Sequence, residues 1–406
     1  MWNYQLECFE CHTQHSERDP GFRCAKCGGL LEVRFELEGR KIPWKRRQLS
    51  VWKYRELLPV HRNQPITTLF EGGTGLHHCQ RLGKRLSLRK LYVKNEGENP
   101  TGSFKDRGMT VAVSKARELG KRRVICASTG NTSASLSAYA ARAGMECTVF
   151  IPQGKVASGK MLQVLMHAAK IVQVKGNFDQ ALDVVVRLTE KKKGFYLMNS
   201  VNPFRLEGQK TLAFEVVDQL NGRAPDTIVF PVGNGGNSSA AWKGFKEFHE
   251  LDIVKDRPRM MGIQAEGAAP IVRAFKQKRK RIRPVTNPQT VATAIRIVSP
   301  VNAPKVLNAL NESEGLAEMV KDSEILNAQR ELARLEGIFV EPASAASIAG
   351  LEKLLQAGQI ERSDLIVCVT TGHGLKDPSV ANSFQSPGYT LNIGDLSSLT
   401  ALEKSL

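Results

Sequence analysis

Four short segments that are almost entirely apolar place the strongest constraint on the fold of this chain. They are residues 124–127, 148–151, 228–232 and 365–369. A strand buried on both faces is apolar throughout, as is typical of parallel sheets covered by helices. Between them lie 106–119, 178–188 and 208–220, where apolar residues recur every three or four positions, as on one face of a helix. This alternation predicts the α/β class with largely parallel sheets.

The composition is that of a globular chain. Of the 406 residues, 41% are hydrophobic and 24% are charged, which excludes a mainly disordered protein. No stretch supplies the roughly 18 consecutive apolar residues that a membrane helix requires. The first residues do not combine a basic patch with an apolar segment, as a secretory signal would. We therefore expect a cytoplasmic protein of two or three domains, since a domain takes about 100–200 residues.

A net charge of +18 raises the question of a nucleic-acid partner. Basic residues cluster at 40–47, 81–90 and 276–283. Such clusters bind nucleic-acid phosphates, but they also occur as solvated surface or as a field that attracts an anionic substrate. Aromatic residues make up only 6% of the chain, and none lies within 276–283, where a stacking platform would need them. The sequence therefore favours plain surface or a small anionic substrate over nucleic acid.

Two CxxC pairs lie close to the N-terminus. Cys8 and Cys11 form the first, and Cys24 and Cys27 form the second after 12 intervening residues. Each pair can supply two thiolates from one tight turn, which together complete the tetrahedral site that zinc prefers. Two disulfides are the alternative, but nothing indicates an oxidising compartment. The pattern predicts a zinc ribbon, whose closed site would be structural because no coordination position remains for chemistry.

Three loops rich in Gly, Ser, Thr and Asn follow predicted strands, at the carboxyl ends where α/β sheets bind ligands. The loop at 128–132 opens a helix of small residues, and exposed amides at a helix N-terminus form an anion site. The loop at 231–238 has three glycines within four positions, so its amides can surround a phosphate. In the loop at 370–374, Thr371 can bond a ring nitrogen or a phosphate, and His373 is as consistent with a turn as with catalysis.

Lys105 stands in a setting that is unusual for a lysine. It follows Pro100, Gly102 and the apolar Phe104, and it precedes a predicted helix that begins near Asp106. A helix N-terminus disfavours a cation and so does burial, and both lower a lysine pKa toward a neutral, nucleophilic amine. Such a lysine, with a phosphate-binding loop and an Asn-bearing loop, indicates pyridoxal phosphate held as a Schiff base.

Six motifs resemble those of the threonine synthase family, a group of tryptophan synthase β-like pyridoxal phosphate enzymes of fold type II. They are NPTGSFKDRG (99–108), STGNTSAS (128–135), PVGNGGNSSA (231–240), ATAIR (292–296), EPASAAS (341–347) and TTGHGLKDP (370–378). They occur in the family's order and spacing across about residues 65–380. The N-terminal cysteines resemble the zinc ribbon of some members. One departure is Gly75, which replaces a proline of the family and predicts a looser turn.

The resemblance implies a role for each matching residue. Lys105 would hold the cofactor and act as acid and base, Asn131 would bond the pyridoxal 3′ oxygen, and Thr371 would face the pyridine nitrogen. The cofactor phosphate would lie on the loop of Gly233, Asn234, Gly235, Gly236 and Asn237. Substrate binding would fall to Ser128, Thr129 and Thr132 for the carboxylate, and to Asn199, Ser200 and Arg205 for the phosphate, which an arginine can bind through two nitrogens.

The implied reaction converts O-phospho-L-homoserine and water to L-threonine and phosphate, by γ-elimination and β-addition of water. Three alternatives remain open. A cysteate synthase, which acts on phosphoserine and sulfite, would share most of these motifs. A threonine dehydratase needs no phosphate pocket, so Arg205 and its neighbours would be idle. A nucleic-acid-binding protein on an inactive scaffold is the third, and the intact Lys105 argues against it.

The resemblance also implies the architecture. We expect a zinc-ribbon-like segment at 1–40, a large cofactor-binding domain formed by 41–105 and 199–390, and a small domain at 106–198. Both α/β domains would have three layers, with pyridoxal phosphate in the cleft between them. Residues 391–406 would form a tail, and the family's usual assembly is a homodimer.

Overall fold

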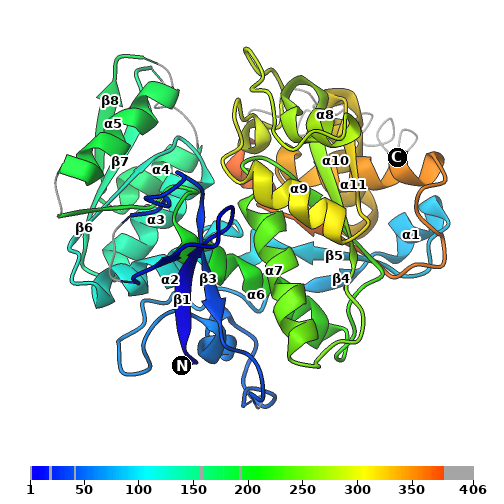
Figure 1. Cartoon of the computed structure of the whole chain (residues 1–406). Helices are drawn as coiled ribbons and strands as arrows, with labels where there is room; N and C mark the ends of the chain where they lie inside the picture. The colour runs from blue at the N-terminus through cyan, green and yellow to red at the C-terminus, as the bar shows by residue number, and fades with distance from the viewer. Residues whose placement is uncertain are drawn as a thin grey trace, which may run out of the picture.

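The computed structural model describes residues 2–17, 21–40, 43–154, 159–176, 178–191 and 194–378. These residues form three sheets with helices packed around them (Figure 1). The predicted tail at 391–406 lies outside the described residues. No helix in the described part of the chain has the length and apolar character needed to cross a lipid bilayer.

The largest sheet joins strands that are far apart in the sequence. Its order is β12 (Leu316–Val320), β11 (Arg259–Ala265), β10 (Thr227–Pro231), β13 (Ile366–Thr370), β5 (Leu91–Asn95) and β4 (Leu76–His78). Neighbouring strands are parallel except β4, which pairs antiparallel with β5 at one edge. Both β10 and β13 are buried at every position, as their apolar runs predicted.

A second sheet comes from one continuous part of the chain. Its parallel strands have the order β8 (Lys170–Val174), β7 (Glu146–Pro152), β6 (Arg123–Ala127) and β9 (Phe195–Leu197). Strands β6 and β7 cover the predicted runs at 124–127 and 148–151. Figure 1 shows this sheet with α3, α4 and α5 on one side of the molecule and the six-stranded sheet on the other.

Eleven α-helices connect and cover the strands of the described chain. They are α1 (Gln80–Leu86), α2 (Lys105–Glu118), α3 (Asn131–Arg142), α4 (Gly159–Met166), α5 (Phe178–Lys191), α6 (Pro203–Gln219), α7 (Gly236–Glu250), α8 (Pro270–Lys276), α9 (Ala303–Glu312), α10 (Asp322–Glu336) and α11 (Pro342–Gln356). Five short 3-10 helices accompany them: η1 (Val51–Leu57), η2 (Glu96–Glu98), η3 (Glu266–Ala268), η4 (Thr293–Ile295) and η5 (Gly374–Lys376). Helix α5 covers the predicted segment 178–188, and α2 and α6 cover 106–119 and 208–220 except for the last residue of each.

Helices α2 and α6 cross in close contact because each carries a glycine at the crossing. A Cβ atom at Gly208 of α6 would lie 1.8 Å from the carbonyl oxygen of Arg107. A Cβ atom at Gly108 of α2 would lie 2.8 Å from the carbonyl oxygen of Arg205. Side chains at either position would force the two backbones apart. The crossing therefore fixes the first turns of both helices side by side.

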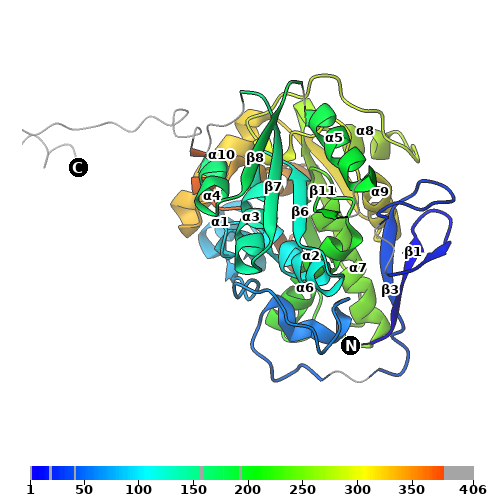
Figure 2. The same ribbon diagram turned by 90° about the vertical axis from the view of Figure 1, so that its left-hand side faces the viewer.

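The N-terminal segment forms a small antiparallel sheet of β1 (Tyr4–Cys8), β2 (Gln14–His15) and β3 (Leu31–Phe35), in the order β2-β1-β3. Its apolar side chains, including Leu6 and Val33, share one buried cluster with Met109 of α2 and Phe204 of α6. Lys305 of α9 donates a 3.1 Å hydrogen bond to the carbonyl of Leu31. Figure 2 shows β1 and β3 beside α7, whose Lys243 donates to the carbonyl of Val33.

The predicted fold class is therefore confirmed. The described chain has an α/β fold with largely parallel sheets, and a cysteine cluster lies at its N-terminus.

Candidate active site

Several helix N-termini carry the residues singled out in the sequence. Lys105 begins α2, Asn131 begins α3, and Arg205 lies in the first turn of α6. Gly236 begins α7, directly after β10 and the glycine loop. Amide groups at a helix N-terminus and the helix dipole both favour an anion. The arrangement is therefore suited to molecules that carry phosphate and carboxylate groups.

Lys105 is only partly exposed and lies close to another cation. Burial, chiefly, and the positive charge of Arg205 lower the pKa of its amine to about 7, although the negative charge of Glu341 acts in the opposite direction. Its Nζ atom lies 4.0 Å from the centroid of the Phe104 ring. At neutral pH a large fraction of this amine is uncharged, as a nucleophile or a proton acceptor requires.

The loop after β13 is held against the start of α2. The carbonyl of Thr371 accepts a 3.0 Å hydrogen bond from the backbone nitrogen of Phe104. The hydroxyl of Ser344 accepts from the backbone nitrogens of Thr371 and Gly372, at 2.9 and 2.8 Å. The hydroxyl of Thr371 lies 3.1 Å from that of Ser344. Thr371 is thus buried and is hydrogen-bonded to Phe104, the residue that precedes Lys105.

Asn131 meets a carboxylate that was not predicted as a site residue. Its Nδ2 donates a 2.9 Å hydrogen bond to Oε1 of Glu341, which lies just before α11. Both side chains are buried, with 5% of Asn131 and 1% of Glu341 exposed. The Oδ1 atom of Asn131 has no hydrogen-bond partner among the described residues.

The glycine loop forms a close-packed cradle. Gly235 precedes α7 with a φ of +80°, a conformation that favours glycine. A Cβ atom at Gly236 would lie 3.2 Å from Oε1 of Gln209 and 3.7 Å from Nδ2 of Asn302. Asn237 is 5% exposed, and neither polar atom of its side chain has a partner in the described structure. The carbonyl of Asn234 accepts a 3.0 Å hydrogen bond from the backbone nitrogen of Asn302.

Arg205 is a buried cation without a partner for most of its guanidinium. It is 1% exposed, and its Nε and Nη1 atoms make no hydrogen bond within the described residues. Burial lowers its pKa to about 10. An unpaired buried charge is costly, so such a group indicates an anionic ligand.

The remaining predicted contacts lie where β6 and β9 end. Ser128, Thr129 and Thr132 surround the start of α3 and are partly buried. Asn199 does something that the sequence did not predict: its amide binds both backbone groups of Ala127, at 3.0 and 2.9 Å. The carbonyl of Ser200 accepts a 3.2 Å hydrogen bond from Asn302.

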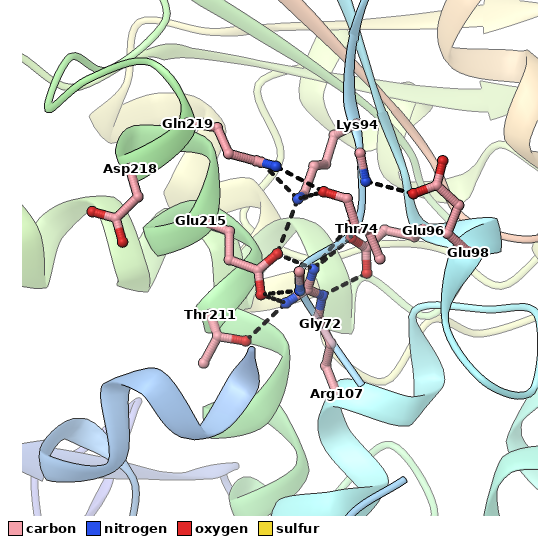
Figure 3. Close-up of polar contacts among 12 residues, drawn as sticks. Gly72, Thr74, Lys94, Glu96, Glu98, Arg107, Thr211, Glu215, Asp218 and Gln219 are labelled. Atoms are coloured by element: carbon pink, nitrogen blue, oxygen red, sulfur yellow. Dashed lines mark hydrogen bonds and ion pairs between the residues drawn. The ribbon is translucent and has the colours of Figure 1, made fainter. Parts of the chain in front are cut away.

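A network of buried charges lies beside the crossing of α2 and α6 (Figure 3). Arg107 binds the carboxylates of Glu96 and Glu215, and Lys94 binds Glu215 at 2.9 Å. All four side chains are fully buried, and their charges balance. Four hydrogen bonds to these carboxylates hold the planar guanidinium of Arg107, two positions after Lys105, in one orientation.

The same network holds the turn that contains Gly75, which the sequence predicted to be loose. The backbone nitrogen of Gly73 donates to Glu215 at 2.8 Å, and the hydroxyl of Thr74 donates to Glu96 at 2.8 Å. The backbone nitrogen of Gly75 itself donates to Glu98 at 2.5 Å. These three hydrogen bonds restrain the turn.

The four N-terminal cysteines converge. Their sulfur atoms all lie within 4.8 Å of one another, and no disulfide joins them in the described chain. Sulfurs bound to one zinc ion lie about 3.8 Å apart, given Zn–S bonds of about 2.3 Å in a tetrahedron. A Cβ atom at Gly29 would lie 2.9 Å from the sulfur of Cys8 and 3.2 Å from that of Cys27. The donor set and its spacing fit a zinc ion.

Comparison with known proteins agrees with this geometry. The family model described as pyridoxal-phosphate dependent enzyme matches residues 67–372. Threonine synthase of Methanocaldococcus jannaschii is 57% identical over 92% of this chain and 93% of the relative. Threonine synthase of Methanosarcina acetivorans is 56% identical, with the same coverage. The chain belongs to the threonine synthase family of pyridoxal-phosphate dependent enzymes.

Two solved structures share the fold of this threonine synthase family chain. Maize serine racemase has a TM-score of 0.65 at 20% identity and covers 76% of this chain and 91% of its own. A processed threonine deaminase from Solanum lycopersicum has a TM-score of 0.63 at 21% identity and covers 82% of this chain and 87% of its own. At this level of identity the likeness concerns the fold alone.

The described residues fit pyridoxal phosphate. The unpaired polar atoms of Asn131 and Asn237 and the amides that begin α7 would receive the ring oxygen and the phosphate. Lys105 has the partly neutral amine that its attachment requires.

Sequence reasoning missed Glu341 and Asn302. The motif EPASAAS was recognised, but nothing in it showed that its acidic residue would contact Asn131. Asn302, in the segment before α9, belongs to no recognised motif. Only its hydrogen bonds with Ser200 and Asn234 place it at the site.

Proposed function

We propose that this chain is a threonine synthase that converts O-phospho-L-homoserine and water to L-threonine and phosphate. The observation that carries the proposal is the pair of Lys105 and Arg205, an amine with a pKa near 7 beside a buried guanidinium with two unpaired nitrogens. A phosphate ester of an amino acid offers an amine to the cofactor near Lys105 and a dianion to Arg205. The names of the similar proteins support the same reaction.

Lys105 would carry the protons in this reaction. The overall change breaks the Cγ–O bond to phosphate, forms a Cβ–O bond to water and leaves Cγ as a methyl group, so protons move at three carbons. Pyridoxal phosphate, when bound, would supply the electron sink that makes the proton at Cα acidic. An amine with a pKa near neutrality can accept a proton at one carbon and return it at the next.

The other predicted residues would bind and orient. Arg205 would hold the substrate phosphate through two nitrogens, with Ser200 nearby. Ser128, Thr129 and Thr132, at the start of α3, would hold the substrate carboxylate. Asn199 would act indirectly, because its side-chain amide holds the backbone of Ala127 at the end of β6.

Several finer assignments belong to the same proposal. The four-stranded sheet would mark a small domain at 106–198, and the six-stranded sheet a large one formed by 41–105 and 199–390. The four cysteines would hold structural zinc. The enzyme would be a cytoplasmic homodimer without a nucleic-acid partner.

The test is phosphate release from O-phospho-L-homoserine by the protein saturated with pyridoxal phosphate, with the amino-acid product identified by mass. We expect phosphate and threonine in equal amounts. Lys105→Ala should lower the rate by about 10³-fold or more, whereas Lys170→Ala, at an exposed lysine of β8, should not. Arg205→Met should chiefly raise the KM. Turnover of phosphoserine with sulfite, but not of phosphohomoserine, would overturn the proposal in favour of a cysteate synthase.

A further inference from the structure

Glu341 lies between two side chains that come from different helices. Its Oε1 accepts the 2.9 Å hydrogen bond from Asn131 of α3, and its Oε2 lies 3.1 Å from Nζ of Lys160 of α4. Asn131 and Lys160 are each 5% exposed and Glu341 is 1% exposed. The three side chains therefore form a buried row in which a carboxylate connects an amide to an ammonium group.

The same residue also touches the loop after β13. The backbone nitrogen of Glu341 donates a 3.0 Å hydrogen bond to the carbonyl of Gly372, next to Thr371. The motif EPASAAS thus contacts both residues expected to bond the cofactor ring, Asn131 and Thr371. The negative charge of Glu341 also acts on Lys105, where it opposes the effect of Arg205 on the lysine pKa.

A structural role for the carboxylate is the competing explanation. Glu341 occupies the N-cap position of α11, where an acidic side chain often bonds the first backbone nitrogens. Here its carboxylate makes no such capping hydrogen bond. Both oxygens instead face side chains of α3 and α4. These contacts are not needed for α11 to form.

The contact with Glu341 also settles how the amide of Asn131 is turned. A carboxylate can only accept, so the Nδ2 side of the amide must face it. That leaves Oδ1 and the second N–H of Asn131 for a bound molecule, and Oδ1 has no partner among the described residues. Without Glu341 the amide would be free to turn over.

We propose that Glu341 is a positioning residue that orients Asn131 toward the cofactor, and that Lys160 offsets its buried charge. The inference rests on the proposed function only in assuming that pyridoxal phosphate binds at this site. It assigns the carboxylate of EPASAAS a task in cofactor binding, and it makes docking of α4 part of the assembly of the site.

The first test is a double-mutant cycle on cofactor affinity. Apo-protein is titrated with pyridoxal phosphate, and the absorbance of the bound cofactor is followed for wild type, Asn131→Ala, Glu341→Ala and the double variant. Each single change should weaken binding about tenfold, the equivalent of one hydrogen bond to a charged group. If Glu341 acts through Asn131, the double variant should stay within about threefold of Asn131→Ala. A double variant about a hundredfold weaker than wild type would show independent effects and overturn the proposal.

A second cycle tests Lys160 and does not depend on Glu341→Ala being folded. Lys160→Met leaves a buried carboxylate without its ion pair and should weaken cofactor binding severalfold. Adding Glu341→Gln removes that charge but keeps an acceptor for Asn131, so Lys160→Met/Glu341→Gln should bind better than Lys160→Met alone. A double variant that binds worse would contradict the proposed pairing.

The control is a matched buried carboxylate outside the site. Glu247 of α7 is 5% exposed and pairs with Lys210 at 2.7 Å. Glu247→Gln should lower stability but leave the cofactor affinity and the absorbance maximum unchanged. Failure of wild type to bind the cofactor would refute the proposed function, whereas normal binding by the wild type and the Glu341 variants would refute this inference alone.

Discussion

At the scale of single residues, three buried side chains of the candidate site carry polar atoms that lack hydrogen-bond partners among the described residues. Asn131, Arg205 and Asn237 each keep polar atoms without a hydrogen-bond partner in the described structure. Most buried polar atoms in proteins are satisfied, and an exception costs about 1–3 kcal/mol. In the candidate site, bound ligands would supply the missing partners of these three side chains.

The pKa of Lys105 leads to a prediction that needs no substrate. Because burial and Arg205 lower this pKa to about 7, the amine should be mostly protonated below pH 7 and mostly neutral above it. Competitive acetylation of the apo-protein, read by mass spectrometry of the Lys105 peptide, should therefore rise with a midpoint near pH 7. In urea the same peptide should titrate near the ordinary lysine value of about 10.4.

The signs of the neighbouring charges extend this prediction. Arg205→Met removes a like charge and should move the midpoint to higher pH, whereas Glu341→Gln removes an opposite charge and should move it to lower pH. A midpoint near 10 in the folded wild type would contradict the assignment.

The sequence predicted some of these residues better than others. Lys105 and the glycine loop were recognisable because their chemistry depends on local features, a helix start and a run of glycines. Glu341 and the pairing of Asn199 with Ala127 depend on contacts between segments that are far apart in the chain. The burial of Arg107 and Lys94 was equally invisible, since a charged residue is exposed by default.

At the scale of elements, the crossing of α2 and α6 aligns the site. The helical periodicity of both was evident in the sequence, but their contact was not, because a glycine inside a helix usually indicates only a weaker helix. Gly208 instead strengthens the packing, since the absence of a side chain lets α6 approach the backbone of Arg107 in α2.

Gly208→Ala should therefore be harmful although alanine favours helices. Its Cβ would lie 1.8 Å from a backbone oxygen, so the helices must separate, and overpacking of this kind costs about 1–3 kcal/mol. We expect a lower urea midpoint together with weaker cofactor binding, since Lys105 and Arg205 lie in the first turns of these helices. Gly262→Ala in β11, where the nearest atom lies at 3.5 Å, is the matched control. Equal stability of Gly208→Ala and wild type would argue against a tight crossing.

At the scale of the whole molecule, the N-terminal ribbon is packed into the fold. It shares a buried cluster with α2 and α6 and is bonded by Lys243 and Lys305. Cysteine spacing alone predicted that its four cysteines would form one cluster. It did not predict where the ribbon would pack, because the partners on α7 and α9 follow it by some two hundred residues or more.

Removal of the proposed zinc ion should consequently destabilise the enzyme as a whole. Cys11→Ser should lower the zinc content measured by atomic absorption, and it should lower the thermal midpoint by several degrees, because metal binding contributes directly to folding. A chelator should lower the midpoint of the wild type in the same way, and added zinc should reverse that effect. The chelator should have no further effect on Cys11→Ser. An unchanged midpoint after complete loss of zinc would show that the ribbon folds without it.

The pairing of β5 with β13 has a consequence for the order in which the protein is made. Leu91 pairs with Ile366, so β5 leaves the ribosome long before the neighbour that completes its side of the sheet. The four-stranded sheet, by contrast, is complete once residue 197 has emerged. Because domains tend to fold as units during synthesis, the smaller sheet can form first. One side of β5 stays unpaired until β13 has been translated. The proposed contact of Thr371 with the cofactor, beside Phe104, would then be possible only after residue 371 has been translated.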